Sequence, residues 1–102
     1  MVKKDRMGNS IAETPEDLAE ILGLRPSIVL EWKMRSEITT QIIETFKKKK
    51  MSITNLALES QTSRARITRI LKGDDFGISL DVLFRVLGAT GQGVQLKFLK
   101  VS

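Results

Sequence analysis

Two short helical patterns stand almost back to back in the middle of the chain. Ser52 opens the segment SITNLALES (52–60) as a helix, and Ser63 caps the segment SRARITRILK (63–72). The two segments meet at the turn QTS (61–63), and Gly73 offers a stop for the second. Short helices that cross steeply at a tight turn need a small residue at the crossing, and Ala57 provides one. This arrangement lets the second helix project toward a groove.

The apolar residues of the second pattern predict which of its faces is buried. Ile67 and Ile70 share one face at helical spacing, so we expect both to point into the core. The other faces carry Arg64, Thr68 and Arg69, with Arg66 at a flank. Such a helix is either an ordinary solvated surface or a surface that meets a polyanion.

The charge distribution favours the polyanion. The formal net charge of the 102-residue chain is +5. Residues 1–46 sum to −2 and residues 74–102 to zero, whereas residues 47–73 sum to +7. The whole positive excess therefore lies in one window. This asymmetry indicates a local anionic partner, with nucleic acid first and an anionic membrane surface second.

The composition argues against catalysis. The chain has no cysteine and no histidine, so it can build no thiolate nucleophile, imidazole base or soft zinc site. The glycines of GATGQG (88–93) follow a helix and lead into a strand, the reverse of a phosphate-binding loop. We expect no enzyme activity, no metal and no cofactor. Without an apolar run of membrane-spanning length or a signal peptide, the expected location is the cytoplasm.

The N-terminal half reads as a tail followed by helices. Residues 1–10 are polar and are expected to form a flexible tail. A short helix is predicted over 14–23, with Gly23 as its stop. Helical spacing of apolar residues resumes over 26–49, and the sequence leaves open whether Ser36 caps a second helix there.

The C-terminal third predicts one helix and one strand. Ser79 is expected to cap a helix over 80–88, and VQLKFLKV (94–101) alternates apolar and polar residues in the manner of a strand. An isolated strand leaves its hydrogen bonds unmade, so it needs a partner. The same strand of a second subunit would give a symmetric dimer, which we favour over pairing within the chain or a tail docked on the core.

The order of these motifs resembles the helix-turn-helix proteins of the Cro/XRE phage-repressor family. The matching pieces are LA (56–57), SRARITRI (63–70) and Gly73, and GISLDVLFRVLGATGQGVQLKF (77–98) resembles the tail of the HigA-like antitoxin branch. The resemblance covers residues 37–99. It implies a mostly α fold, a five-helix domain of the lambda-repressor-like helix-turn-helix type with a short C-terminal β-strand.

Two positions depart from the family pattern. Gln61 stands where the family often has glycine in a left-handed turn, at a cost on the order of 1 kcal/mol. Ile53 stands where the family commonly has a glutamine that contacts a phosphate. Isoleucine cannot make that contact, so Lys50, Ser52 and Thr54 are the candidate substitutes.

The resemblance also implies which residues contact DNA. The second helix would lie in the major groove and read base edges with Ser63, Arg64, Ala65, Thr68 and Arg69. Arginine can bind guanine bidentately, and alanine can meet a thymine methyl group. Phosphate contacts, which position the helix without specifying sequence, are assigned to Lys50, Ser52, Thr54, Arg66 and Lys72.

The expected function is therefore a sequence-specific DNA-binding repressor, acting at the nucleoid as a homodimer on a palindromic operator of double-stranded DNA. The antitoxin resemblance adds a small basic ribonuclease toxin as partner. Residues 11–35 form an N-terminal helical segment that would bind it, ahead of a helix-turn-helix domain over 36–102. In the alternative view, residues 11–46 simply complete the core.

Other functions remain open at this point. One is a phage-type regulator that stands alone, without a toxin. Another is an adaptor whose basic face binds an acidic protein surface. A third is a peripheral membrane binder that uses KKKKM (47–51). The basic cluster spans two helices and a turn rather than one amphipathic helix, which argues against the membrane.

Overall fold

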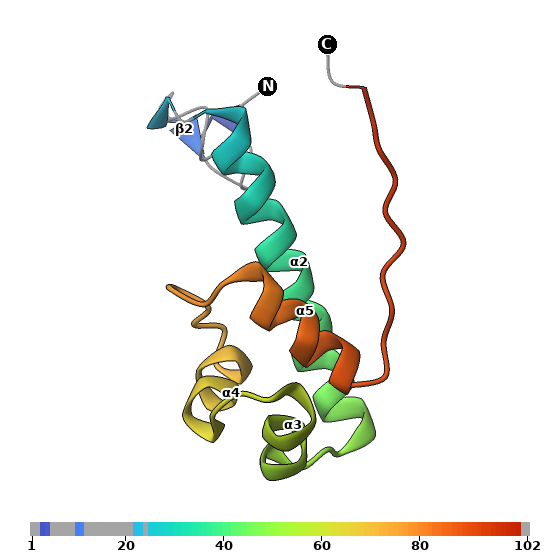
Figure 1. Cartoon of the computed structure of the whole chain (residues 1–102). Helices are drawn as coiled ribbons and strands as arrows, with labels where there is room; N and C mark the ends of the chain where they lie inside the picture. Colours follow the sequence, from blue (N-terminus) through green and yellow to red (C-terminus); the bar gives the residue numbers. More distant parts are fainter. Residues whose placement is uncertain (1–2, 5–9, 12–21, 24, 101–102) are drawn as a thin grey trace. The chain divides into compact units, whose positions relative to one another are not determined.

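The fold is mostly helical, as predicted. The computed structural model describes residues 3–4, 10–11, 22–23 and 25–100. The described residues contain four α-helices and one small antiparallel sheet (Figure 1). By its internal contacts the chain divides into two compact units, residues 1–37 and 38–102.

A two-stranded sheet lies near the start of the first unit. Its strands are β1 (Lys3–Lys4) and β2 (Ser10–Ile11), which pair antiparallel. This pairing differs from the flexible polar tail predicted over 1–10. The other residues of that predicted tail lie outside the described ones.

The helix predicted over 14–23 also lies outside the described residues, apart from its last two. Gly23 has a φ of 69°, the left-handed conformation expected of a helix stop. The described part of the chain thus shows four helices where five were predicted.

A single long helix, α2 (Pro26–Lys49), answers the question that the sequence left open. Pro26 occupies the first helical position, where its missing N–H costs nothing. Ser36 is exposed inside the helix and does not interrupt it. The last turn carries Lys47, Lys48 and Lys49, cations that complement the negative end of the helix dipole.

Three short helices complete the second unit: α3 (Ile53–Ser60), α4 (Arg64–Leu71) and α5 (Leu80–Ala89). α3 packs against both α4 and α5 (Figure 1). The core of the second unit is aliphatic, because each helix turns one apolar face inward. The core residues are Ile38, Ile42, Leu56, Ala57, Ile67, Ile70, Ile78, Val82, Leu83, Val86 and Leu87.

Polar groups inside this unit are hydrogen-bonded. Thr39 donates to a carboxylate oxygen of Asp75 at 2.8 Å, and the Ser60 hydroxyl donates to the Leu56 carbonyl at 2.6 Å. No buried side-chain nitrogen or oxygen among the described residues lacks a partner. Since an unpaired buried polar group costs about 1–3 kcal/mol, these bonds keep the small core free of that penalty.

Of the C-terminal strand predicted over 94–101, the described residues 94–100 form no strand in the single chain. Residues 92–100 belong to no strand (Figure 1). They are exposed and make no backbone hydrogen bond with described residues. The reason is the one that makes any lone strand unstable, namely that no second strand of this unit lies beside it.

The described residues contain neither a candidate membrane span nor a candidate metal site. No helix there is both long enough and apolar enough to cross a membrane. No cluster of acidic, cysteine or histidine side chains there could hold a metal ion.

Candidate nucleic-acid interface

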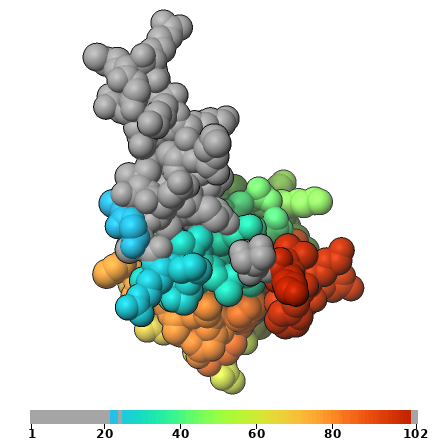
Figure 2. All heavy atoms as spheres, turned by 90° about the horizontal axis from the view of Figure 1, so that it is seen from above, coloured from blue at the N-terminus to red at the C-terminus, as the bar shows by residue number. Residues whose placement is uncertain are grey.

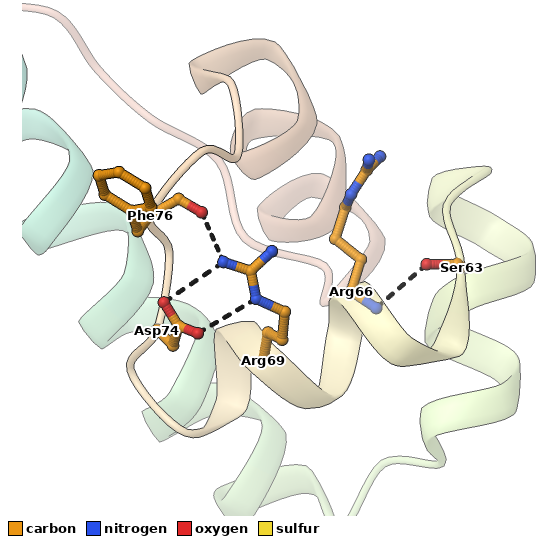
Figure 3. Close-up of polar contacts among 5 residues, drawn as sticks. All are labelled: Ser63, Arg66, Arg69, Asp74 and Phe76. Atoms are coloured by element: carbon orange, nitrogen blue, oxygen red, sulfur yellow. Dashed lines mark hydrogen bonds and ion pairs between the residues drawn. The ribbon is translucent and has the colours of Figure 1, made fainter.

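Serine caps set the starts of α3 and α4. The Ser52 hydroxyl oxygen accepts a hydrogen bond from the Asn55 N–H at 3.3 Å. The Ser63 hydroxyl oxygen accepts one from the Arg66 N–H at 3.1 Å (Figure 3). Each serine satisfies a backbone donor that the helix itself cannot pair. The two helices therefore begin one residue after the serines that the sequence singled out.

The turn between the helices is a Schellman motif centred on Gln61. Gln61 has φ 56° and ψ 44°, a left-handed conformation. Its N–H donates to the Leu58 carbonyl at 3.3 Å, and the Thr62 N–H donates to the Ala57 carbonyl at 3.1 Å. The departure from glycine therefore has not reshaped the turn, because glutamine adopts the backbone that glycine would favour.

α4 ends in the same motif. Gly73 has a φ of 82°, its N–H donates to the Ile70 carbonyl at 2.9 Å, and the Asp74 N–H donates to the Arg69 carbonyl at 3.0 Å. The sharp reversal at Gly73 brings the chain back toward the last turn of α4. This reversal places Asp74 beside a residue five positions earlier.

The inner face of α4 is fully buried. Ile67 and Ile70 both have an exposed fraction of 0%, and Ala57 of α3 is 6% exposed at the crossing. Close packing at all three positions leaves α4 little freedom to rotate about its axis. The outward faces of the helix are therefore defined by its core.

The predicted base-reading residues lie on these outward faces. Arg64 and Ala65 are exposed, Ser63 is exposed while it caps the helix, and Thr68 is half-buried. The Thr68 hydroxyl donates to the Arg64 carbonyl at 3.0 Å, so only its lone pairs are open to a further partner. The helix thus brings together four of the five predicted base-reading residues, Ser63, Arg64, Ala65 and Thr68. The one charged residue of these four, Arg64, forms no ion pair with a described residue.

The fifth predicted reader, Arg69, is held by its own chain. Its guanidinium forms an ion pair with the Asp74 carboxylate at 3.1 Å and also donates to the Phe76 carbonyl (Figure 3). The hydrogen bond from Arg69 lowers the pKa of Asp74, and the same bond raises the pKa of Arg69. Arg69 therefore has less freedom than Arg64 to take a new partner.

Arg66 extends in another direction. Figure 3 shows its side chain pointing away from the cluster of Arg69, Asp74 and Phe76. Its guanidinium donates to the Thr62 hydroxyl at 3.3 Å, across the turn. Arg66 thus lies at a flank of the helix, as its spacing predicted.

The predicted phosphate-contacting residues near α3 are all exposed. Lys50, Ser52 and Thr54 precede or begin the helix, where its N–H groups and dipole also favour an anion. Ile53 lies between them and packs against the core, which is why it has no polar role. Lys72, the C-cap of α4, is exposed as well.

Three contacts here were not foreseen from the sequence. The Lys49 ammonium donates to the Thr90 carbonyl at 2.7 Å, so this lysine of the KKKK run helps to end α5. Asp74 and Phe76 hold Arg69, although neither drew notice as a site residue. The only local hint was an acidic residue directly after the glycine that ends α4.

Two short helices joined at a left-handed turn, with the second anchored inside and basic outside, define a helix-turn-helix unit. A comparison with protein families matches residues 24–98, well over half of the chain, to a helix-turn-helix domain, and the chain belongs to that family. Comparisons with curated proteins and with solved structures gave no match.

Proposed function

We propose that this chain is a sequence-specific transcriptional repressor that places α4 in the major groove of an operator. The observation that carries the proposal is the way α4 divides into a buried apolar face and exposed basic faces. Its inner face is fully buried through Ile67 and Ile70, and its outer faces carry arginines. A helix held this firmly can present the same side chains to base edges each time it binds.

In this proposal the base readers are Ser63, Arg64, Ala65, Thr68 and Arg69. Arg64 is the strongest of them, because it is exposed, has no ion-pair partner among the described residues, and lies in the first turn of the helix. A bidentate arginine–guanine contact discriminates against other bases by about 1–3 kcal/mol. A guanine-containing half-site is therefore expected.

The phosphate contacts are assigned to Lys50, Ser52, Thr54, Arg66 and Lys72. Their supporting feature is exposure, with Lys50, Ser52 and Thr54 at or near the start of α3, Arg66 on α4 and Lys72 at the C-cap of α4. Contacts of this kind fix the register of the protein on the duplex and release counterions from it.

A finer proposal is that the repressor is an antitoxin. The resemblance to the HigA-like branch of the Cro/XRE family, whose domains are lambda-repressor-like, supports it. The partner would be a small basic ribonuclease toxin, bound by the N-terminal segment 11–35, and the pair would repress its own operon from the nucleoid in the cytoplasm. Much of that segment lies outside the described residues, so the sequence alone supports this step.

The test of DNA reading is a comparison of two duplexes. A preferred duplex is selected from a random pool, and affinity is measured on it and on a scrambled duplex over a range of salt concentrations. Arg64→Ala should lose about 1–3 kcal/mol, roughly 5- to 150-fold, on the preferred duplex alone. Lys50→Gln should weaken both duplexes alike and reduce the salt slope by about one.

The matched control is Arg85→Ala, which removes the same charge from an exposed position of α5. It should leave the difference between the two duplexes unchanged. Equal losses on both duplexes for Arg64→Ala would show that α4 does not read sequence. A chain with no preferred duplex at any salt concentration would contradict the repressor proposal as a whole.

The antitoxin step has its own test. Where a short reading frame adjoins the gene, its product is expressed with and without this chain, and cell growth and RNA integrity are compared. Rescue by this chain supports the antitoxin, and rescue should be lost when residues 11–35 are removed. If DNA reading stands but no toxin is neutralised, the chain is a stand-alone regulator.

A further inference from the structure

We propose that the outward face of α4 holds a small apolar site, formed by Ala65 and Thr68, that recognises the 5-methyl group of a pyrimidine in the major groove. The inference rests on the proposed function and deepens it, because it names the chemical group that this face takes from the operator. Thymine carries such a group, and a cytosine methylated at the same ring carbon carries it as well.

Ala65 lies opposite the residues that anchor α4. At about 100° per residue around the helix axis, it stands about 160° from Ile67 and about 140° from Ile70. Both isoleucines are fully buried, whereas Ala65 is exposed. Figure 2 views the second unit from the side that α5 (orange) covers, and little of α4 (yellow) is visible there. Ala65 is therefore at the centre of the face that α4 has left for a partner.

Around the helix, Ala65 and Thr68 lie between Arg64 and Arg69. The same spacing puts Thr68 about 40° from Arg64 and Ala65 about 40° from Arg69, with about 60° between the two small residues. The middle of the outward face thus carries two short side chains, and long basic side chains stand on both sides of them. A helix with such a face approaches the floor of the groove most closely at Ala65.

A hydrogen bond sets the chemistry of Thr68. Its hydroxyl donates to the Arg64 carbonyl at 3.0 Å, one turn back along α4. The hydroxyl proton is therefore already used, and the methyl group stands on a different bond of the same Cβ, away from that carbonyl. The lone pairs of the hydroxyl are the polar alternative, because they can accept a hydrogen bond from a base amino group. The methyl group of Thr68 and the Cβ of Ala65 together make an apolar pair.

The ligand that matches this pair is a methyl group. In the major groove of unmodified DNA, thymine alone presents one, while the other groups that identify the bases are hydrogen-bond donors and acceptors. Residues three apart on a helix have Cβ atoms about 5–6 Å from each other, so one methyl group can contact both Ala65 and Thr68. Because arginine prefers guanine, the expected half-site combines a 5-methylated pyrimidine with a neighbouring guanine.

Single methyl changes in the duplex test the site. In the preferred duplex, each thymine is replaced in turn by deoxyuridine, which pairs identically but lacks the methyl group, and each cytosine by 5-methylcytosine. One thymine replacement in each half-site should weaken binding about fourfold, the effect of one buried methyl group. A gain of this size at one cytosine would also support the site and would identify 5-methylcytosine as its ligand. A preferred duplex that responds to neither change would overturn the methyl site and leave DNA reading intact, whereas the absence of any preferred duplex would overturn both.

Two substitutions of Thr68 separate the role of its methyl group from that of its hydroxyl. The measured quantity is the ratio of affinities for the duplexes with and without the critical methyl group, so a change in folding stability cancels. Thr68→Ser keeps the hydroxyl and should bring this ratio closer to one, whereas Thr68→Val keeps a methyl group and should leave the ratio unchanged. The matched control is Thr40→Ser, which removes a methyl group from an exposed position of α2 and should have no effect on the ratio. A ratio that survives in Thr68→Ser and disappears in Thr68→Val would overturn the proposal, because the hydroxyl would then be the group that contacts the base.

Discussion

The two ends of α4 differ in what holds their arginines. At the first turn, Arg64 is exposed and forms no ion pair with a described residue. At the last turn, Arg69 is bound by Asp74 and by the Phe76 carbonyl (Figure 3). The same helix therefore presents one arginine that is ready to take a partner and one that must first give up partners.

This difference shows that the positive charge of an arginine and its freedom to contact DNA are separate properties. Both arginines contribute to the positive window of the sequence, but the charge of Arg69 is largely balanced by a carboxylate 3.1 Å away. A DNA contact by Arg69 would replace bonds that it already makes, so its net gain is smaller than the gain of a free arginine. Of the two, Arg64 should dominate base discrimination.

The largest expected effect is a loss of stability on truncation of a core residue in the middle of α4, because that residue holds both ends of the helix in place. Ile67 lies between them and is fully buried. Ile67→Ala should lower the free energy of unfolding by about 2–5 kcal/mol, because it removes buried methyl groups and leaves a cavity. Chemical denaturation of the full chain measures the loss. DNA reading by both ends should then weaken together.

Leu58→Ala is the matched control for this prediction. Leu58 lies on α3 and is 72% exposed, so its truncation should change the free energy of unfolding by no more than about 0.5 kcal/mol. Similar losses for Ile67→Ala and Leu58→Ala would mean that α4 is not anchored through its inner face.

The sequence predicted what depends on near neighbours. The caps at Ser52 and Ser63 and the burial of Ile67 and Ile70 follow from patterns within one or two helical turns. The left-handed turn at Gln61 was implied by the family resemblance, in which this position often holds glycine. These features form the frame of the candidate site.

The features that the sequence did not predict depend on distant or external partners. The contact from Lys49 to Thr90 joins residues 41 positions apart. The bond between Arg69 and Asp74 needs the reversal at Gly73, which a helical pattern does not show. The C-terminal strand was predicted from its alternation, but a strand also needs a partner that one chain does not contain.

A second prediction concerns a variant in which Arg69, at the end of α4, loses its ion pair and so becomes similar to Arg64 at the start of the helix. Asp74→Asn removes the charge that holds Arg69, so Arg69 becomes available to the duplex. The loss of affinity caused by Arg69→Ala should therefore be larger in the Asp74→Asn variant than in the unchanged chain. A double-mutant cycle on the preferred duplex measures this coupling. A smaller loss would show that Asp74 positions Arg69 for DNA instead of competing for it.

The stability that the Arg69–Asp74 pair contributes to the fold should depend on pH, and the Asp74→Asn variant measures it. The pKa of Asp74 is lowered in the folded chain, mainly by its hydrogen bond from Arg69. The stability that this pair contributes is complete above the unfolded-state pKa and disappears as the pH falls through the lower folded-state value. The difference in unfolding free energy between the unchanged chain and Asp74→Asn should therefore be constant near neutral pH and vanish in acid. A difference that grew in acid would contradict this assignment.

The smallest expected effects concern the turns that flank α4, which have the same geometry and different residues. Gln61 has φ 56° and Gly73 has φ 82°, both left-handed. Gln61→Gly should raise the free energy of unfolding by at most about 1 kcal/mol, because glycine avoids the steric cost but has more freedom in the unfolded chain.

The reverse change, Gly73→Ala, should lower the free energy of unfolding by about 1 kcal/mol. A Cβ at Gly73 would meet nothing within 4 Å, so only the backbone conformation is penalised there. Denaturation of both variants side by side measures the pair. If Gln61→Gly is destabilising by more than the roughly 0.5–1 kcal/mol that the extra freedom of glycine in the unfolded chain accounts for, while Gly73→Ala behaves as expected, the Gln61 side chain must stabilise the turn by a contact of its own. The departure from glycine would then be a source of stability for the unit that presents Arg64.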